Sequence, residues 1–135
     1  MLNADLRHLA RHQVMGLAVQ FLLGMAVNLL GLPSQVTGAA HTASTVFLAA
    51  HVLITLGLLA GAAMIIRATA RPQNPSRQLA IWGAIAIAAT TAAGILNMIT
   101  KSNWWSFGMA LGFIASLLTY GGLLMQARTP SQQSG

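Results

Sequence analysis

The chain has 135 residues, of which 56% are hydrophobic and only 6% are charged, whereas soluble domains carry about 25% charged residues. This composition excludes an ordinary soluble domain and indicates a membrane protein. Seven Lys and Arg against one acidic residue, Asp5, give a net charge of +6, and the absence of Cys excludes disulfides, zinc–thiolate sites, Cys nucleophiles and iron–sulfur clusters.

Four apolar runs follow one another along the chain, at about residues 14–32, 43–66, 79–99 and 104–125. Each is close to the roughly 20 residues that a helix needs to cross a hydrocarbon core of about 30 Å. Short segments connect them, so consecutive helices are predicted to run antiparallel. We therefore predict one transmembrane domain over residues 13–127, with no separate soluble domain.

The two ends of the chain differ from this domain. Residues 1–12 place Leu6 and Leu9 on one helical face and Arg7 on another, which is typical of an amphipathic helix in the lipid headgroup region. Residues 128–135 are polar and are predicted to form a disordered tail.

The distribution of cations predicts the orientation, because cytoplasmic loops collect Lys and Arg. Only Lys101 falls between the third and fourth runs, and the other six cations share the opposite side: Arg7, Arg11, Arg67, Arg71, Arg77 and Arg128. The predicted fold is therefore all-α, an up-down four-helix transmembrane bundle with both termini in the cytoplasm. Since topology explains the positive charge, no nucleic-acid partner is expected.

Small residues recur at helical spacing in the runs, and close packing by small residues is what holds helices together in lipid. The fourth run carries Gly108, Gly112, Ser116 and Tyr120 at every fourth position. This ridge is predicted to contact another helix. Similar ridges occur in the first run and, from Gly83 onward, in the third.

Polar residues within the runs predict a pocket that opens on the outer side of the membrane. His51 is the only His, Lys, Arg, Asp or Glu side chain inside a span, and such a residue is a functional hypothesis by default. Asn28, Asn97 and Ser106 lie at a similar depth on the other three helices. Trp105, with Trp104 and Lys101, is expected at the rim, and both Trp residues also suit an ordinary aromatic belt at the membrane interface. The residues expected to continue the pocket inward are Gln20, Thr55, Thr90 and Thr91.

Three other interpretations of these residues remain open. The amides and His51 could form a purely structural network of interhelical hydrogen bonds, each worth about 0.6 kcal/mol. His51 could be an axial ligand of haem b. It could also bind Cu(I) together with the thioethers of Met25, Met98 and Met109, because Cu(I) accepts soft ligands.

The stretches Gln20–Asn28 and Ser106–Phe113, with His51 and Tyr120, resemble small uncharacterised four-span membrane proteins of bacteria, especially actinobacteria. The resemblance implies a bacterial cytoplasmic membrane and a multi-pass topology. The first two spans are also faintly similar to one half of haem A synthase, which implies a haem-ligating role for His51. The fourth span lacks the second His of that pattern.

These residues contain no nucleophile paired with a base, no carboxylate within a span and no phosphate-binding loop, so an enzyme is not expected. The predicted function is a non-enzymatic module for binding or transport of a small ligand, or an accessory subunit, with its pocket around His51. The alternative is a membrane redox protein that holds haem b. Expected partners are membrane lipid and either further copies of the chain or a larger membrane complex.

Overall fold

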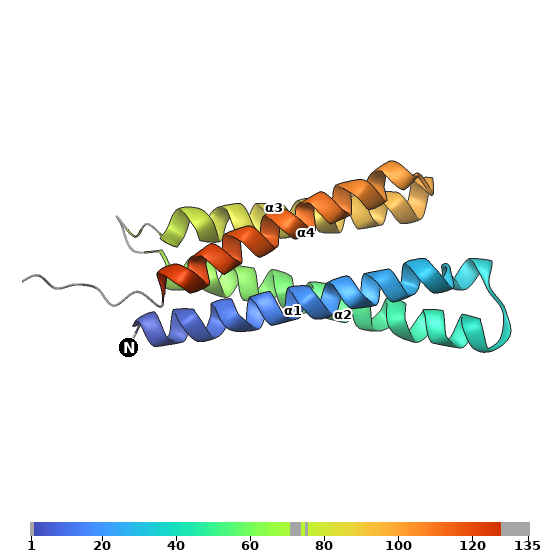
Figure 1. Cartoon of the computed structure of the whole chain (residues 1–135), viewed down its shortest axis with the longest axis horizontal. Helices are drawn as coiled ribbons and strands as arrows, with labels where there is room; N and C mark the ends of the chain where they lie inside the picture. Colours follow the sequence, from blue (N-terminus) through green and yellow to red (C-terminus); the bar gives the residue numbers. More distant parts are fainter. Residues whose placement is uncertain (1, 71–73, 75, 128–135) are drawn as a thin grey trace, which may run out of the picture.

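The computed structural model describes residues 2–70, 74 and 76–127, and among these it contains helices and no strands. The helices are α1 (Leu2–Leu30), the short 3₁₀ helix η1 (Pro33–Gln35), α2 (Gly38–Ala68), α3 (Ser76–Thr100) and α4 (Asn103–Gln126) (Figure 1). The four α-helices are long and apolar enough to cross a membrane. The protein is thus a multi-pass membrane protein built from α-helices, as composition predicted.

The helices are longer than the predicted spans, although α1 ends at Leu30, before the predicted end of its span at residue 32. For example, α2 begins at Gly38, whereas its apolar run begins at residue 43. The predicted bounds followed apolar content, but backbone hydrogen bonding continues through polar residues such as His41 and Thr42. Hydropathy therefore located each helix and underestimated its length.

The amphipathic segment predicted at residues 1–12 is continuous with the first span. Residues 2–12 are the first turns of α1, which runs unbroken to Leu30. Leu6 and Ala10 are buried there, because they pack in the same apolar cluster as Ile65. Residues 128–135, predicted as a disordered tail, lie outside the described residues.

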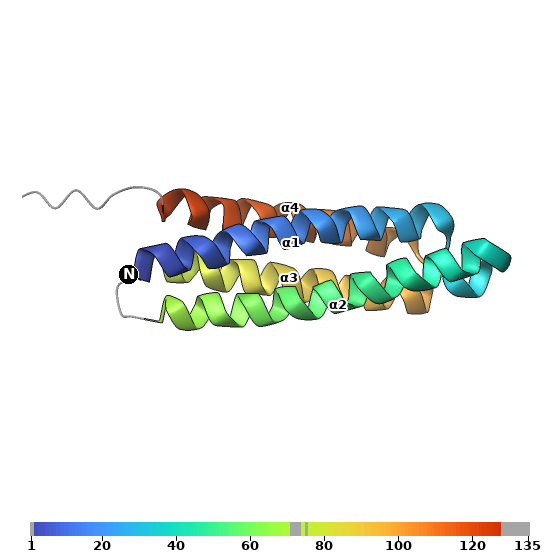
Figure 2. The ribbon, with the colours of Figure 1, turned by 90° about the horizontal axis from the view of Figure 1, so that it is seen from below.

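The four helices form two antiparallel hairpins, α1 with α2 and α3 with α4. Contacts of α1 with α4 and of α2 with α3 join the hairpins side by side. Figures 1 and 2 show the chain direction alternating from helix to helix, with the start of α1 and the end of α4 at the same end. Figure 1 also shows the hairpins close together at this terminal end and diverging toward η1 and the α3–α4 connection.

The turn between α1 and α2 is fixed by glycine and by a side-chain hydrogen bond. Gly31 adopts φ +86°, a left-handed conformation that glycine tolerates best, and its N–H donates to the Val27 carbonyl at 3.0 Å. The hydroxyl of Ser44 on α2 donates to the Gly31 carbonyl. These bonds attach the end of α1 to the start of α2.

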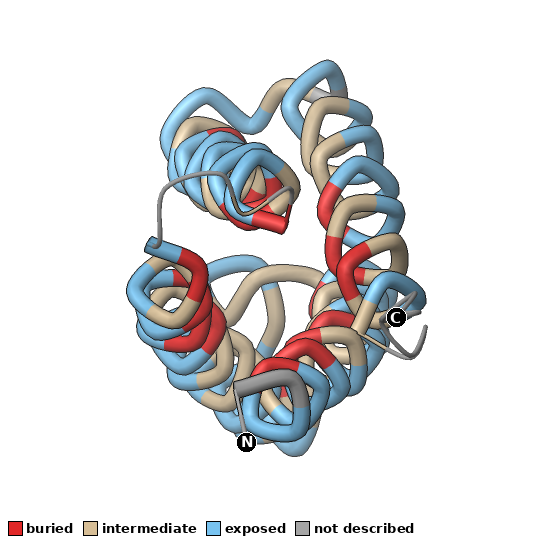
Figure 3. The backbone as a smooth tube through the Cα atoms, turned by 90° about the vertical axis from the view of Figure 1, so that its left-hand side faces the viewer, coloured by how far each residue is buried: buried red, intermediate tan, exposed pale blue. Residues whose placement is uncertain are grey.

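The apolar core occupies the terminal half of the bundle. Its buried residues come from the first halves of α1 and α3 and from the second halves of α2 and α4, and Figure 3 shows buried positions turned toward the centre. The same spacing of buried positions recurs 70 residues apart on α1 and α3, in the pairs Leu6 and Ser76, Ala10 and Ala80, Gln13 and Gly83, and Leu17 and Ile87. The two hairpins therefore present corresponding faces to the core.

The predicted ridge on α4 is confirmed as a helix contact. Ser116 and Tyr120 are buried, and a Cβ placed on Gly112 would collide with the side chain of Thr90 on α3. On α3, a Cβ at Gly83 would lie 2.7 Å from Tyr120. Small residues thus bring α3 and α4 into close contact, as expected for helices in lipid.

Candidate functional site

A cavity of about 610 Å³ lies between the hairpins, in the half of the bundle where they diverge. Residues from all four helices line it. Its deep end is formed by buried apolar side chains such as Leu17, Leu58 and Ile87, and Gln35 and Lys101 lie at the end near the connections. The cavity therefore extends from the connections to about the middle of the bundle.

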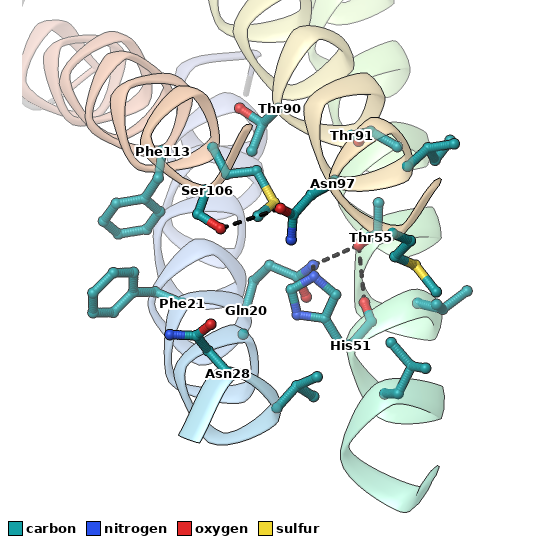
Figure 4. A pocket seen from close by; sticks show the side chains of 18 of the residues that line it. Gln20, Phe21, Asn28, His51, Thr55, Thr90, Thr91, Asn97, Ser106 and Phe113 are labelled. Carbon is teal, nitrogen blue, oxygen red and sulfur yellow. Dashed lines mark hydrogen bonds between the residues drawn. The ribbon is translucent and has the colours of Figure 1, made fainter. Parts of the chain in front are cut away.

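Five of the six residues predicted for the pocket line this cavity: Asn28, His51, Thr55, Asn97 and Ser106 (Figure 4). The structure thus brings side chains from four helices to one space. Lys101, expected at the rim, lines it as well.

Trp105 does not line the cavity, contrary to the prediction, and both Trp104 and Trp105 are exposed on the outside of the bundle. The reason is helical geometry: Ser106 faces Asn97 across the α3–α4 contact, and the preceding residue projects about 100° away. Trp105 and Ser106 are neighbours at a similar depth, but their side chains point in different directions.

Gln20 connects α1 to α2 in the middle of the cavity wall. Its Nε2 lies 3.0 Å from His51 Nε2 and donates a second, short hydrogen bond to Thr55 Oγ1 (Figure 4). An amide nitrogen can only donate, so His51 Nε2 accepts, and a neutral ring carries its proton on Nδ1. Thr55 in turn donates to the His51 carbonyl at 2.9 Å.

The other hairpin contributes a separate polar pair. Ser106 on α4 donates to Asn97 Oδ1 on α3 at 3.3 Å. The Asn97 amide nitrogen points into the space between the hairpins, toward the side on which Gln20 and His51 lie (Figure 4). Each hairpin therefore brings its own polar pair to one shared cavity.

Two buried polar atoms of the Gln20–His51 pair, Gln20 Oε1 and His51 Nδ1, have no hydrogen-bond partner within the described part of the chain. His51 packs against Gly24, where an added Cβ would lie 3.2 Å from Cε1 and 3.6 Å from Nδ1. An unpartnered buried polar atom costs about 1–3 kcal/mol. His51 Nδ1 is thus inside the wall, while the residue as a whole borders the cavity.

The remaining wall is largely apolar. Phe21 on α1 and Phe113 on α4 stack with ring centroids 4.8 Å apart, which joins the two hairpins on one side of the cavity. Leu, Ile and Val side chains supply much of the rest, and Thr90 and Thr91 donate their hydroxyls to carbonyls of their own helix. Their polar groups are thereby satisfied within α3.

For a metal or haem, the cavity offers one imidazole, that of His51, and the thioethers of Met25, Met98 and Met109. His8, His12 and His41 lie elsewhere, so this chain cannot ligate a haem through two imidazoles inside the cavity. The described residues contain no group of three His, Cys, Asp or Glu side chains arranged to hold a metal ion.

The sequence predicted Gln20 only as an inward continuation of the pocket, whereas in the structure Gln20 bonds both His51 and Thr55 and is the centre of the polar network. Its position on the ridge with Gly16 and Gly24 was the available signal, because residues four apart share a helical face. The Phe21–Phe113 pair carried no such signal, since it joins helices that are distant in sequence.

No protein-family model matches this chain, and no curated protein and no solved structure shows significant similarity to it.

Proposed function

We propose that this protein is a non-enzymatic membrane module whose cavity around His51 takes up a small amphiphile, as a binding or transport-type protein or as an accessory subunit. The observation that carries this proposal is a cavity of about 610 Å³ with a largely apolar wall and polar groups near the connections. Ligand pockets are typically about 300–1,000 Å³ and have such a lining.

The charges around the cavity favour a neutral or anionic ligand. Among the residues that the structure describes, Lys101 is the one charged residue in the lining, and the only acid in the sequence, Asp5, lies on α1 at the opposite end. A cationic group would find no carboxylate there, and an unpaired charge away from water is costly. In this proposal the ligand's polar head lies near Lys101, Asn28 and Asn97, and its apolar part extends toward Leu17 and Leu58.

The proposed orientation has both termini in the cytoplasm of a bacterial cell, so that the cavity opens outward. Arg7, Arg11, Arg67 and Arg77 lie at the terminal end, and Lys101 lies at the other end. Arg71 and Arg128, which also contributed to the prediction, are outside the described residues. This distribution matches the excess of cations in cytoplasmic segments.

Orientation is tested by single cysteines, since the chain has no Cys of its own. In intact cells, Ser34→Cys in η1 is expected to react with a membrane-impermeant maleimide, because η1 lies outside. Gln78→Cys at the start of α3 is expected to react only after permeabilisation. The reverse pattern would place the cavity mouth in the cytoplasm and contradict the proposal.

Ligand binding is tested by photolabelling in lipid vesicles with a diazirine-bearing dodecanol. Unlabelled dodecanol and dodecanoate are expected to compete for saturable labelling of cavity residues, and dodecylammonium is not. His51→Ala is expected to reduce labelling about 2- to 10-fold, the value of one hydrogen-bonding group, because the residue borders the cavity and orients Gln20.

Trp105→Ala is the matched control, since Trp105 lies near the connection but outside the cavity lining, and it should label as the unmodified protein does. A His51→Ala variant that loses stability and keeps full labelling would favour the purely structural network instead. Non-saturable labelling of the unmodified protein would refute the binding proposal itself.

The haem b alternative is supported by one observation, namely that His51 and three Met residues line the same cavity. It requires a Soret band in protein purified after expression with haem supplied, and loss of that band in His51→Ala. The amphiphile proposal requires neither.

A further inference from the structure

A second group of potential ligands lies at the terminal end of the bundle, far from the cavity. His8 and His12 are one turn apart on α1, and both are exposed. Their Nε2 atoms are 3.1 Å apart, and the rings meet edge to face with centroids 4.3 Å apart. The two nitrogens thus share one hydrogen bond at the protein surface, in which one ring donates and the other accepts.

The spacing of these nitrogens matches that of two ligands on one metal ion. Imidazole nitrogens bind such ions at about 2.0–2.1 Å, and at angles between those of octahedral and tetrahedral sites two of them are about 2.9–3.4 Å apart. The observed 3.1 Å lies in this range. A shared ion would replace the proton of this hydrogen bond, with both rings then carrying their protons on Nδ1.

We propose that His8 and His12 form a surface site for a divalent transition-metal ion of the Cu²⁺, Ni²⁺ and Zn²⁺ class. Imidazole suits these ions, and Cu²⁺ is expected to bind most tightly. Since the described residues contain no third His, Cys, Asp or Glu in reach, water completes the coordination. Asp5 shares the helical face and contributes a negative charge nearby.

The helix itself holds the site in place. Ala10 and Gln13, on the other face of the same turns, are buried, and Gln13 Nε2 donates to the Leu58 carbonyl of α2 at 2.7 Å. The backbone that carries both imidazoles is therefore fixed against α2. A preorganised pair binds better than two independent side chains, because joining two ligands gains about 100-fold or more.

The test titrates the tag-free, full-length protein in detergent with NiCl₂ by isothermal titration calorimetry. One saturable site per chain is expected, and His8→Ala and His12→Ala should each weaken it about 100-fold. With Cu²⁺, electron paramagnetic resonance should show coupling to two imidazole nitrogens in the unmodified protein and to fewer in either variant.

His41→Ala is the matched control, because His41 is also exposed but bonds the Pro33 carbonyl at the other end of the bundle, and it should bind Ni²⁺ as the unmodified protein does. The proposal is overturned if the unmodified protein shows no saturable site. It is equally overturned if either single variant loses less than tenfold in affinity, since one imidazole would then suffice. Neither outcome bears on the cavity.

Discussion

Replacing Gly83 with alanine is expected to destabilise the bundle, although alanine normally favours a helix over glycine by about 1 kcal/mol. The new Cβ would lie 2.7 Å from Tyr120 Cζ and 2.8 Å from Cε2. Tyr120 is fully buried, so its ring cannot turn away without disturbing the core. Overpacking of this kind costs about 1–3 kcal/mol. Equilibrium unfolding of the purified protein in detergent, followed by circular dichroism, measures the loss.

Gly121→Ala on α4 provides the control for this substitution. A Cβ at Gly121 meets nothing within 4 Å, so only the gain in helix propensity remains, at most about 1 kcal/mol. Tyr120→Leu should partly rescue Gly83→Ala, because it removes the ring that the new methyl group meets, and residues in contact couple. Equal effects of Gly83→Ala and Gly121→Ala would show that α3 and α4 do not approach at Tyr120.

Filling the cavity with a large side chain is expected to abolish ligand labelling. Ala110 lies on α4 in the cavity lining, and an indole at this position would occupy space assigned to the ligand's apolar part. We expect Ala110→Trp to lose saturable photolabelling by the diazirine-bearing dodecanol. Stability should change little, because the cavity has room and the indole would bury apolar surface within it.

Ala115→Trp is the matched control, since Ala115 is exposed on the same helix and is not part of the cavity lining. It adds the same side chain to the outer surface and should leave labelling intact. Undiminished labelling of Ala110→Trp, with a folded protein, would place the ligand outside the cavity. Loss of labelling in both variants would indicate that the probe binds the lipid-facing surface.

Much of the fold was predictable because few backbone structures are stable within a lipid bilayer. A chain that crosses a bilayer must satisfy its backbone hydrogen bonds internally, so long apolar runs become helices. Small residues every four positions predicted that α4 contacts another helix, since close packing is what holds helices together in lipid. Ser116 and Tyr120 confirm this, as both are buried.

The first turns of α1 were less predictable. Leu6 and Leu9 on one face suit either a helix that lies in the lipid headgroup region or a helix that packs against other helices. In both environments an apolar face is buried. Only the other helices decide between them, and here the core cluster that contains Ile65 and Leu123 receives Leu6. An amphipathic pattern predicts that one face of a helix is buried, but it does not show whether lipid or another helix buries that face.

By itself, the sequence determined the class, the number of apolar helices and the presence of polar side chains at one depth on four of them. Tertiary structure alone decided that the hairpins diverge, that His51 bonds Gln20 and that Trp105 points outward. The physical reason is that hydropathy and helical period describe one helix at a time, whereas the cavity depends on the angle between the hairpins. That angle is set by contacts between residues distant in sequence, such as Phe21 on α1 with Phe113 on α4.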